Sequence, residues 1–476
     1  MMRSLYSGVS GLKVHQTKMD VIGNNIANVN TTGFKASTAR FSDVFYQTTQ
    51  AASGPNEVTG TAGKNAMQIG LGASVSSIST SITTTGGAQR TDNALDIMIN
   101  GDAFFVVNTG GENLFTKDGS FTIDANGNLC TYSGALVMGW PANKETGTVS
   151  PDTVEKLQVM SADRLYSSPE ATTAATISGN IDKFDSQITT TGRAVQISFY
   201  DEMGNKFNAK FEVKQVDGSE TEYSVALTDV LDKNNASIFT EYDEATKEYK
   251  VKDDITFSFG GEEYTIAMKD AQKGTLEITG ATQVIKFDGS TGKFVSVGGD
   301  DSADKNKLTF GINKDGENPF RNIDIDFSSL TMYSTSGKST LESQMGDLEG
   351  ANAGKQVGEM TGLAIDASGK IYGKYDNGDS LLLGQIAVAT FNNPAGLESV
   401  GGNMFSATLN SGEFDGIGQD PSTGGGSLST GVLEMSNVDL AAQFTDLIVT
   451  QRGYQANSRI ITTSDTLLEE LINLKR

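Results

Sequence analysis

The sequence predicts a mainly β protein with helical termini. Eight Asn-Gly or Asp-Gly dipeptides, which favour tight hairpin turns, lie between residues 100 and 416 of the 476-residue chain. The chain also contains 54 glycines, and short alternating apolar and polar runs fill its centre. Near both ends, however, apolar residues recur every seven positions, which is the spacing of paired helices. We therefore expect N- and C-terminal helices that pair in a coiled-coil-like inner domain, followed by two nested β domains of barrel or sandwich type, the second inserted into the first.

The first predicted element is a helix over residues 3 to 29. Its apolar residues form one narrow stripe of sevenfold spacing, with two further residues three positions on. The stripe comprises Leu5, Leu12, Met19, Ile22, Ile26 and Val29. Gly8, Gly11 and Gly23 weaken such a helix in isolation, so we expect it to order only when packed. A helix on a membrane surface is the alternative, which the absence of Trp and Phe from the apolar face disfavours.

The end of this helix is rich in asparagine and glycine. Short amide side chains compete for backbone hydrogen bonds and suit a cap or a turn. The predicted junction motif consists of Gly23, Asn24, Asn25, Asn28, Gly33 and Phe34. Residues 31–72 are then expected to form an extended connecting arm, with a possible short helical turn around residues 41 to 46.

The centre of the chain is predicted to contain two β domains. Residues 73–145 and 360–432 would form the first domain, and residues 150–340 would form an outer domain inserted into it. Linkers rich in glycine and polar residues, near residues 143–151 and 334–360, mark the exit from the first domain and the return to it. The terminal helical domain would comprise residues 1–30 and 436–476.

The last predicted element is a helix that runs to about residue 474. Its apolar stripe consists of Leu440, Phe444, Leu447, Tyr454, Ile461 and Leu468, with Ile472 beside it. Polar Gln451, Ser458 and Asp465 interrupt this stripe, which is poor for a stable hairpin of two helices. An intramolecular hairpin with no further role is one interpretation. The other is that both helices need neighbours from other copies, and repeated contacts between unlike faces build an open helical polymer.

Composition excludes several classes of function. The formal net charge is −23, and the acidic excess lies in the central region, so nucleic acid is not an expected partner. The single cysteine, Cys130, cannot form an internal disulfide, and its role stays open. No apolar run is long enough to span a membrane, and the N-terminus lacks the apolar core of a secretory signal. If the protein is exported, we expect a route without a cleavable signal peptide.

No motif predicts catalysis, a cofactor or a metal. A calcium loop beginning at Asp124 would need glycine and a carboxylate where Leu129 and Ala135 stand, so a hairpin turn explains it better. The only histidine, His15, lies on a predicted helix, far from any nucleophile motif, and the acidic cluster at residues 300–304 is expected to be a solvated loop. We therefore predict no enzyme activity, no catalytic residue, no cofactor and no metal site.

Three motifs resemble the family of bacterial flagellar rod and hook axial proteins, and specifically its hook members. Residues 10–12 (SGL) and 19–35 (MDVIGNNIANVNTTGFK) are similar to the N-terminal signature of that family. Residues 436–440 (SNVDL) and 451–457 (QRGYQAN) are similar to its C-terminal signature. Residues 383–391 (LGQIAVATF), followed by Asn393-Pro394 and Gly396-Leu397, resemble the inner β domain of hook proteins. The resemblance covers roughly the first 145 and the last 120 residues.

The resemblance implies a structural subunit of the flagellar hook. Many copies would form a curved hollow tube that acts as a universal joint and transmits torque from rod to filament in motility. The implied partners are other copies of the chain, the rod and hook-filament junction proteins, the hook cap and the type III export apparatus. The implied location is the hook, an extracellular appendage of the bacterium. A distal rod or hook-filament junction protein of the same family, and a surface adhesion or binding module, are the alternatives.

Overall fold

A computed structural model describes residues 2–55, 60, 62–144, 146–298, 305–314, 319–423 and 426–474. The predicted acidic loop at residues 300–304 and the predicted turn at Asp315-Gly316 lie outside these residues. The chain divides into two units. Unit 1 comprises Met1–Leu165, Thr361–Lys374 and Ser380–Arg476, and unit 2 comprises Tyr166–Met360 and Tyr375–Asp379. The domain boundaries proposed from the sequence stay predictions.

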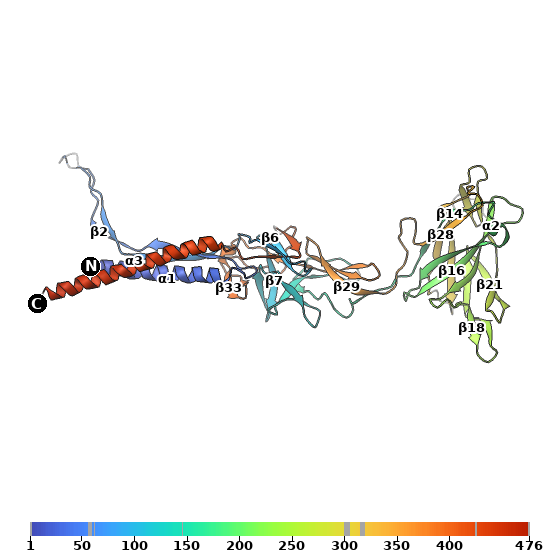
Figure 1. The fold of residues 1–476 in the computed structure, drawn as a ribbon, viewed down its shortest axis with the longest axis horizontal. Coiled ribbons are helices and arrows are strands. Elements are labelled where there is room, and N and C mark those ends of the chain that lie inside the picture. Colours follow the sequence, from blue (N-terminus) through green and yellow to red (C-terminus); the bar gives the residue numbers. More distant parts are fainter. Residues whose placement is uncertain are drawn as a thin grey trace. The chain divides into compact units, whose positions relative to one another are not determined.

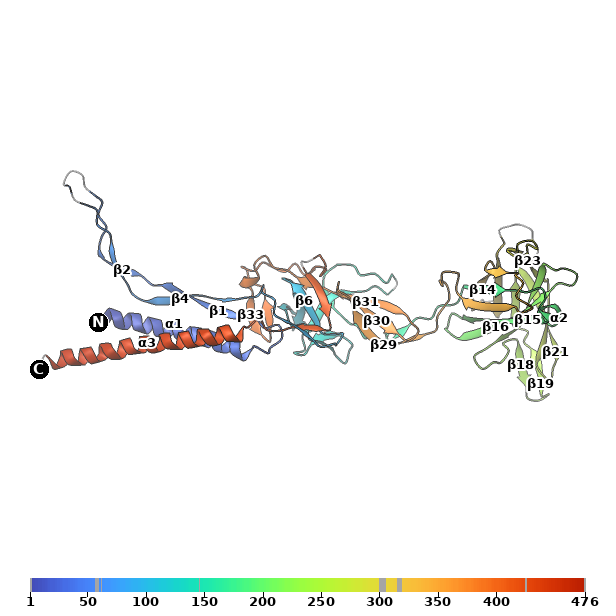
Figure 2. The ribbon, with the colours of Figure 1, turned by 45° about the horizontal axis from the view of Figure 1, so that its top comes forward.

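Two long helices form one end of unit 1. Helix α1 spans Met2–Ala27 and helix α3 spans Leu440–Asn473. They lie side by side, with the N- and C-termini at the same end (Figures 1 and 2). Helix α3 begins where the carboxylate of Asp439 accepts hydrogen bonds from the backbone N–H groups of Ala441 and Ala442, at 2.9 and 3.2 Å. The terminal helices are therefore in contact, as the fold class predicted. No helix among the described residues is long and apolar enough to cross a membrane.

The arm after α1 consists of two antiparallel ribbons. Strand β1 (Ser37–Asp43) pairs with β4 (Ala73–Thr80), and β2 (Tyr46–Gln50) pairs with β3 (Met67–Gly70). The β1–β4 ribbon packs on α1. The short helical turn expected around residues 41 to 46 is wrong, because residues 41–43 pair with residues 73–75 instead. That partner is some thirty residues away in sequence, so local propensity does not reveal it.

The remainder of unit 1 is a β structure with one main sheet. Its strands follow the order β30-β31-β11-β7-β8-β34-β33, and two short pairs, β5 with β36 and β6 with β35, complete it. Its core includes Phe104, Phe115 and Trp140, which are at most 2% exposed. The strands of unit 1 are β5 (Ala88–Arg90), β6 (Ile97–Gly101), β7 (Phe104–Thr109), β8 (Glu112–Thr116), β9 (Phe121–Ile123), β10 (Leu129–Thr131), β11 (Leu136–Pro141), β12 (Glu155–Lys156), β30 (Lys370–Tyr375), β31 (Ser380–Ile386), β32 (Val388–Ala389), β33 (Glu398–Gly401), β34 (Met404–Ser406), β35 (Gly426–Thr430) and β36 (Val432–Glu434), with the 3-10 helix η1 (Pro394–Gly396). Strand β29 (Gly358–Ile365) begins in unit 2 and continues into unit 1, and the last residue of β30 belongs to unit 2.

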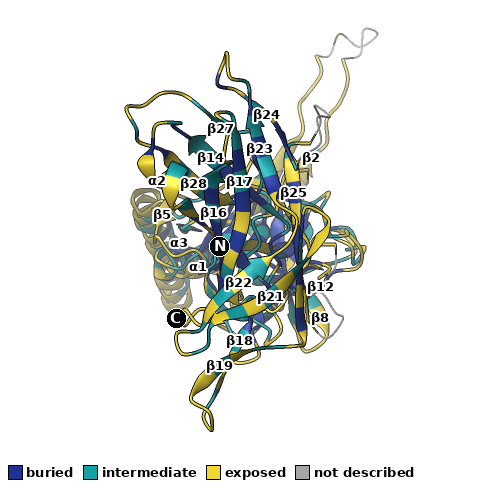
Figure 3. Ribbon diagram, turned by 90° about the vertical axis from the view of Figure 1, so that its right-hand side faces the viewer, coloured by how far each residue is buried: buried dark blue, intermediate teal, exposed yellow. Residues whose placement is uncertain are grey.

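Unit 2 is a sandwich with its own core. One sheet has the order β22-β21-β20-β25-β26-β14-β27, with β28 beside β14, and the other has the order β15-β16-β17-β23-β24. Aromatic residues of the two sheets meet between them; the ring centroids of Phe199 and Phe310, for example, are 5.9 Å apart. Its elements are β13 (Tyr166–Ser167), β14 (Ala174–Asn180), α2 (Ser186–Thr190), β15 (Arg193–Tyr200), β16 (Lys206–Gln215), β17 (Glu222–Leu231), β18 (Thr240–Asp243), β19 (Glu248–Val251), β20 (Ile255–Phe259), β21 (Glu262–Asp270), β22 (Thr275–Thr279), β23 (Gln283–Phe287), β24 (Phe294–Val297), β25 (Lys307–Lys314), β26 (Ile323–Asp326), β27 (Leu330–Thr331) and β28 (Thr340–Met345). The strands of the sandwich are buried where they face each other, whereas the β18–β19 hairpin projects from it (Figure 3).

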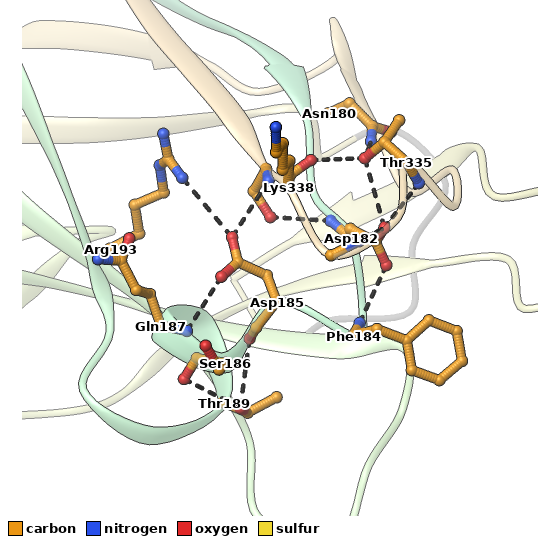
Figure 4. A network of polar contacts seen from close by, with 12 residues as sticks. Asn180, Asp182, Phe184, Asp185, Ser186, Gln187, Thr189, Arg193, Thr335 and Lys338 are labelled. Atoms are coloured by element: carbon orange, nitrogen blue, oxygen red, sulfur yellow. Dashed lines mark hydrogen bonds and ion pairs between the residues drawn. The ribbon is translucent and has the colours of Figure 1, made fainter.

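Two buried carboxylates, near the start of unit 2, accept hydrogen bonds from the segment with which the chain leaves its sandwich (Figure 4). The Asp182 carboxylate accepts hydrogen bonds from the backbone N–H groups of Phe184, Thr335 and Gly337, at 3.0, 2.6 and 2.8 Å. These N–H donors, that of Phe184 first, hold the pKa of Asp182 below its ordinary value. Asp185 caps α2 and accepts a hydrogen bond from the Ser339 N–H at 3.1 Å. The inserted unit is thus closed by polar contacts between its two ends.

Candidate assembly interface

Helices α1 and α3 approach each other closely because small residues lie at their contact. A Cβ atom on Gly11 would lie 2.6 Å from the Asn457 Nδ2 atom, and one on Gly8 would lie 3.3 Å from a side-chain carbon of Ile461. A Cβ on Gly453 would lie 2.7 Å from the His15 ring. Glycines that weaken an isolated helix therefore provide the surface on which its partner packs. Burial, with the Lys18 cation nearby, lowers the pKa of His15 at this contact.

On the face of α3 that packs against α1, the polar residues are at other positions than the predicted ones. Besides Gly453, the residues of α3 that are partly or fully buried are Gln443, Leu447, Thr450, Tyr454, Asn457, Ile461, Ser464 and Leu468. The spacing alternates between three and four residues from Leu447 onward, as expected for two packed helices. The polar residues on this face are Gln443, Thr450, Asn457 and Ser464. Gln451, Ser458 and Asp465, which were predicted to interrupt the stripe, are exposed. Both sets are polar, so the pattern alone could not choose between them.

The structure brings most of the predicted stripe residues together within one chain. Those of the N-terminal stripe, Leu5, Leu12, Met19, Ile22, Ile26 and Val29, are all partly or fully buried, and Val29 lies just beyond the end of α1. On α3, Leu447, Tyr454, Ile461 and Leu468 are partly buried. Leu440, Phe444 and Ile472 are not, with exposures of 39%, 50% and 68%. A contact between these residues and another copy of the chain stays a prediction.

A second apolar face of α3 is exposed. Val449, Ile460, Leu467 and Leu471 are between 42% and 62% exposed. With smaller residues, Val449, Ile460 and Leu467 follow a sevenfold pattern of their own, in which Ala442, Val449 and Ala456 form one row and Ile460, Leu467 and Leu474 form the other. Sequence reasoning followed only one stripe and missed this one, although the pattern is present in the sequence. A continuous exposed apolar face on a helix indicates a site of association.

The predicted junction motif ties α1 to both the arm and α3. Asn25, only 1% exposed, accepts a hydrogen bond from the Ser37 N–H at 3.0 Å and donates to the Ser37 carbonyl at 2.8 Å. Its amide also donates to the Gln443 side chain of α3 at 3.1 Å. The Asn28 amide donates to the Asn24 carbonyl at 2.9 Å, which closes the last turn of α1. Gly23 is exposed, with open space around it, and makes no such contact.

Gly33 occupies a position that only glycine fits easily. Its φ is +67°, and a Cβ there would lie 2.8 Å from the Asp118 backbone nitrogen. The Gly33 N–H donates to the Glu434 carbonyl at 2.8 Å, so the N-terminal segment is bonded to β36. Phe34 follows and is partly buried. The motif therefore lies where the helices meet the β part of unit 1.

A buried ion pair lies beside Gly33, and sequence reasoning did not assign it. The Lys35 Nζ is 2.7 Å from the Glu434 Oε1, and the two side chains are 1% and 0% exposed. Lys35 also donates to the Thr84 carbonyl at 2.9 Å, and Glu434 Oε1 accepts from the Gly86 N–H at 2.8 Å. A lone carboxylate among apolar residues in β36 (Val-Leu-Glu-Met) was the available signal. The pair joins residues about 400 positions apart.

A second buried lysine lies near this pair. The Lys117 Nζ donates to the Gly101 carbonyl at 2.6 Å and lies 4.9 Å from the centroid of the Phe104 ring. Burial, reinforced by the Lys35 cation, lowers the pKa of Lys117 to about 8, although Glu434 acts in the opposite direction. The junction therefore contains two buried cations and one carboxylate.

The described residues show no arrangement that points to catalysis. They contain no group of three or more His, Cys, Asp or Glu side chains placed to hold a metal ion. The Asp124 carboxylate accepts hydrogen bonds from the backbone N–H groups of Asn126 and Asn128, at 2.9 and 2.8 Å, and so stabilises a turn. Cys130 is buried, and burial raises the pKa of its thiol.

Paired terminal helices, an exposed apolar face on α3 and a buried junction to the β part of unit 1 are the features expected of a structural protein. Family models match three segments: "Flagella basal body rod protein" at residues 5–35, "Flagellar hook protein FlgE/F/G D1 domain" at 98–184 and "Flagellar basal body rod FlgEFG protein C-terminal" at 429–474. The chain is 36% identical to the flagellar hook protein FlgE of Borreliella burgdorferi and 33% identical to that of Treponema pallidum, and each comparison covers 100% of both chains. A crystal structure of the Helicobacter pylori hook protein FlgE2 matches 73% of this chain and 100% of its own, with 14% identity and a TM-score of 0.35.

The chain therefore belongs to the flagellar hook protein FlgE family. It is a structural subunit of the flagellar hook, part of the extracellular flagellum, and is not an enzyme. The resemblance found in the sequence is confirmed, and membership of this family implies polymerisation with flagellar axial proteins.

Proposed function

We propose that copies of this chain assemble through the exposed apolar face of α3 into a curved hollow tube. The tube would act as a universal joint that transmits torque from rod to filament. Helices α1 and α3 of neighbouring copies would line its inner wall, and units 1 and 2 would carry its outer shells. The observation that supports this proposal best is the second apolar face of α3, on which Val449, Ile460 and Leu467 are exposed in the single chain.

The partners at the two ends of the tube belong to the same proposal. Rod and hook-filament junction proteins would present terminal helices of the same pattern, so the apolar face of α3 could continue from one kind of subunit to the next. The hook cap and the type III export apparatus would act during assembly. Repeated contact between unlike faces gives an open helical array, which suits such a series of subunits.

The test places one charge on the exposed face. Ile460→Asp should fold like the unaltered chain, because Ile460 is 42% exposed in the single chain. It should not polymerise, because assembly would bury an unpaired carboxylate. Purified protein is concentrated and examined by electron microscopy for tubes, and circular dichroism of the unassembled protein checks its helix content.

Gln455→Asp is the matched control. Gln455 is exposed on the same helix but lies on neither apolar face. This variant should form tubes at the same protein concentration as the unaltered chain. Tubes from Ile460→Asp at that concentration would contradict the proposed interface, and an unaltered chain that forms no tubes would contradict the proposed function itself.

A further inference from the structure

Unit 2 contains a cavity of about 460 Å³ with an apolar interior and a basic rim. Aromatic and aliphatic side chains, including Phe207, Phe320 and Ile255, line its interior. Four lysines also line it, Lys206, Lys233, Lys252 and Lys314. Such a cluster is unusual in a chain whose formal net charge is −23.

The lysines of this cavity have no counter-ion among the described residues. The ion pairs of unit 2 involve other lysines and arginines, such as Lys250 with Asp243 and Arg321 with Glu202. Asp232, the one acidic residue among the described residues that line the cavity, accepts hydrogen bonds from the backbone N–H groups of Asn234 and Ala236, at 2.8 and 2.9 Å. The described lining residues therefore carry an excess of positive charge, and a partner that fits them has carboxylates around an apolar group.

The β18–β19 hairpin of the same unit has that chemistry. It projects from the sandwich (Figure 3), and Tyr242 on it is 49% exposed. Glu241 and Glu244 lie one residue before and two residues after Tyr242 in the sequence, and both are exposed without an ion pair among the described residues. Asp243 is already paired with Lys250 at 2.6 Å, so among residues 241–244 the carboxylates without an ion pair are those of Glu241 and Glu244.

The base of this hairpin forms one wall of the cavity. Thr240 at the start of β18 and Lys252 just after β19 both line it. The strands run away from the cavity for four residues each, roughly 13 Å, and the hairpin cannot fold back onto its own base. Hairpin and cavity are therefore separate surfaces of one unit, and a contact between them must involve two copies.

We propose that the β18–β19 hairpin of one subunit docks into the lysine-lined cavity of unit 2 in a second copy of this chain. Tyr242 enters the apolar interior, and Glu241 and Glu244 meet the lysines at the rim. Because each copy offers one hairpin and one cavity, the contact repeats in one direction and produces an open row rather than a closed dimer. This inference rests on the proposed function, since only an assembled tube holds the copies side by side.

Such a contact would be weaker than the contact between helices. Its charged groups lie near the surface, so each ion pair contributes little and is screened by salt. The docking of an aromatic ring and two carboxylates can therefore release and re-form, which suits rows that lengthen and shorten as a curved tube turns.

The first test uses a double variant, Tyr242→Cys with Lys206→Cys, in the full chain. The natural Cys130 is buried and does not compete. Tubes are assembled, oxidised mildly, dissolved in denaturant without reductant and separated on a gel. The expected result is a ladder of dimers, trimers and longer covalent chains, because each subunit links to two neighbours.

Tyr242→Cys with Asp217→Cys is the matched control. Asp217 is exposed and lies beyond the far end of β16, the strand that begins at Lys206. This control should give no ladder. Tubes of the first variant that yield no more product than the control would overturn the proposal, and dimers without longer products would also overturn it, since they indicate a closed contact between like surfaces.

A second measurement needs no substitution and covers the case in which the double variant does not assemble. Hydrogen exchange of the unaltered chain is compared before and after assembly. Amides of residues 230–251, which include the hairpin and a wall of the cavity, should exchange at least tenfold more slowly in tubes. Unchanged exchange there, in tubes that electron microscopy confirms, overturns the docking but leaves the proposed function standing. An unaltered chain that forms no tubes refutes both.

Discussion

Replacing Glu434 by leucine tests whether the buried ion pair stabilises the joint between the helices and the β part of unit 1. The change keeps a similar bulk and removes the acceptor of the Lys35 ammonium and of the Gly86 N–H. It also leaves Lys35 and Lys117 buried near each other, with the carbonyl groups of Thr84 and Gly101 as their respective acceptors. Two buried cations then share a site with no carboxylate in contact.

The magnitude follows from those contacts. Removal of one partner of a buried ion pair costs on the order of 3–5 kcal/mol, and a buried N–H that loses its acceptor adds roughly 1 kcal/mol or more. We therefore expect the free energy of unfolding of unit 1 to fall by about 4 kcal/mol. Replacement of the other partner, Lys35→Met, should lower the free energy of unfolding by less, because Lys117 still balances the charge of Glu434.

The assay is urea unfolding of the full chain, followed by the fluorescence of its one tryptophan. Trp140 is 2% exposed in the core of unit 1, so its signal reports on that unit and not on unit 2. The double variant Lys35→Met with Glu434→Leu should recover most of the loss, because apolar residues often replace a buried pair without a net cost. An exposed pair gives the matched control: Asp446→Ala, which breaks the contact with Lys18, should cost less than about 1 kcal/mol.

Two results would refute this reasoning. One is a loss below about 1 kcal/mol for Glu434→Leu, the level of an exposed ion pair. The other is a double variant as unstable as the single one, which would show that the cost comes from altered packing rather than from an unpaired charge.

Two further predictions concern the same joint. Gly33→Ala should lower the free energy of unfolding of unit 1 by about 1–3 kcal/mol, because Gly33 has a φ of +67° and a Cβ there would meet the Asp118 backbone. The control, Gly23→Ala, lies on an open helix surface and should not destabilise the unit. Equal effects of the two changes in the Trp140 assay would contradict the predicted clash. Between pH 8 and 10.5, unit 1 should become more stable as the pH rises. In this range Lys117 has released its proton in the folded chain, where its pKa is about 8, but still binds it in the unfolded chain, where its pKa is 10.5. The slope is on the order of 1 kcal/mol per pH unit, and Lys117→Met should lack it in the same assay; the same slope in both chains would contradict the assignment.

Features that repeat along the chain were predictable from the sequence. Sevenfold spacing indicated both terminal helices, and turn dipeptides indicated the β centre, because these signals act within a few residues. The β1–β4 ribbon was not predictable in this way, because residues 41–43 obtain their strand partner about thirty positions later. Asn25 and Gly33 were singled out as joint residues, but their partners in β1, α3 and β36 come from three distant segments.

The register of α3 shows a second limit. A polar residue stands both three and four positions after Leu447, so the choice between Thr450 and Gln451 depends on which of them meets α1. Gly11 decides this in the structure, because the absence of its side chain leaves room for Asn457. The ion pair Lys35–Glu434 depends even more on tertiary structure, since the apolar neighbours of Glu434 indicate a buried carboxylate but do not identify Lys35, about 400 positions away, as its partner.

Within one chain, unit 1 makes buried polar contacts at its joint but leaves apolar residues of its helices exposed. At the joint, a buried ion pair, Asn25 and the Gly33 N–H leave few polar groups unsatisfied, and such contacts are costly to break. Along the helices, α1 and α3 meet through glycines, polar residues and partly buried apolar residues such as Leu447, while Val449 and Ile460 stay exposed. Because the hydrophobic effect scales with buried apolar area, assembly that covers these exposed residues would stabilise the helices further. A subunit whose joint is held by buried polar contacts, and whose helices keep apolar residues exposed, buries those residues only when it assembles with other copies.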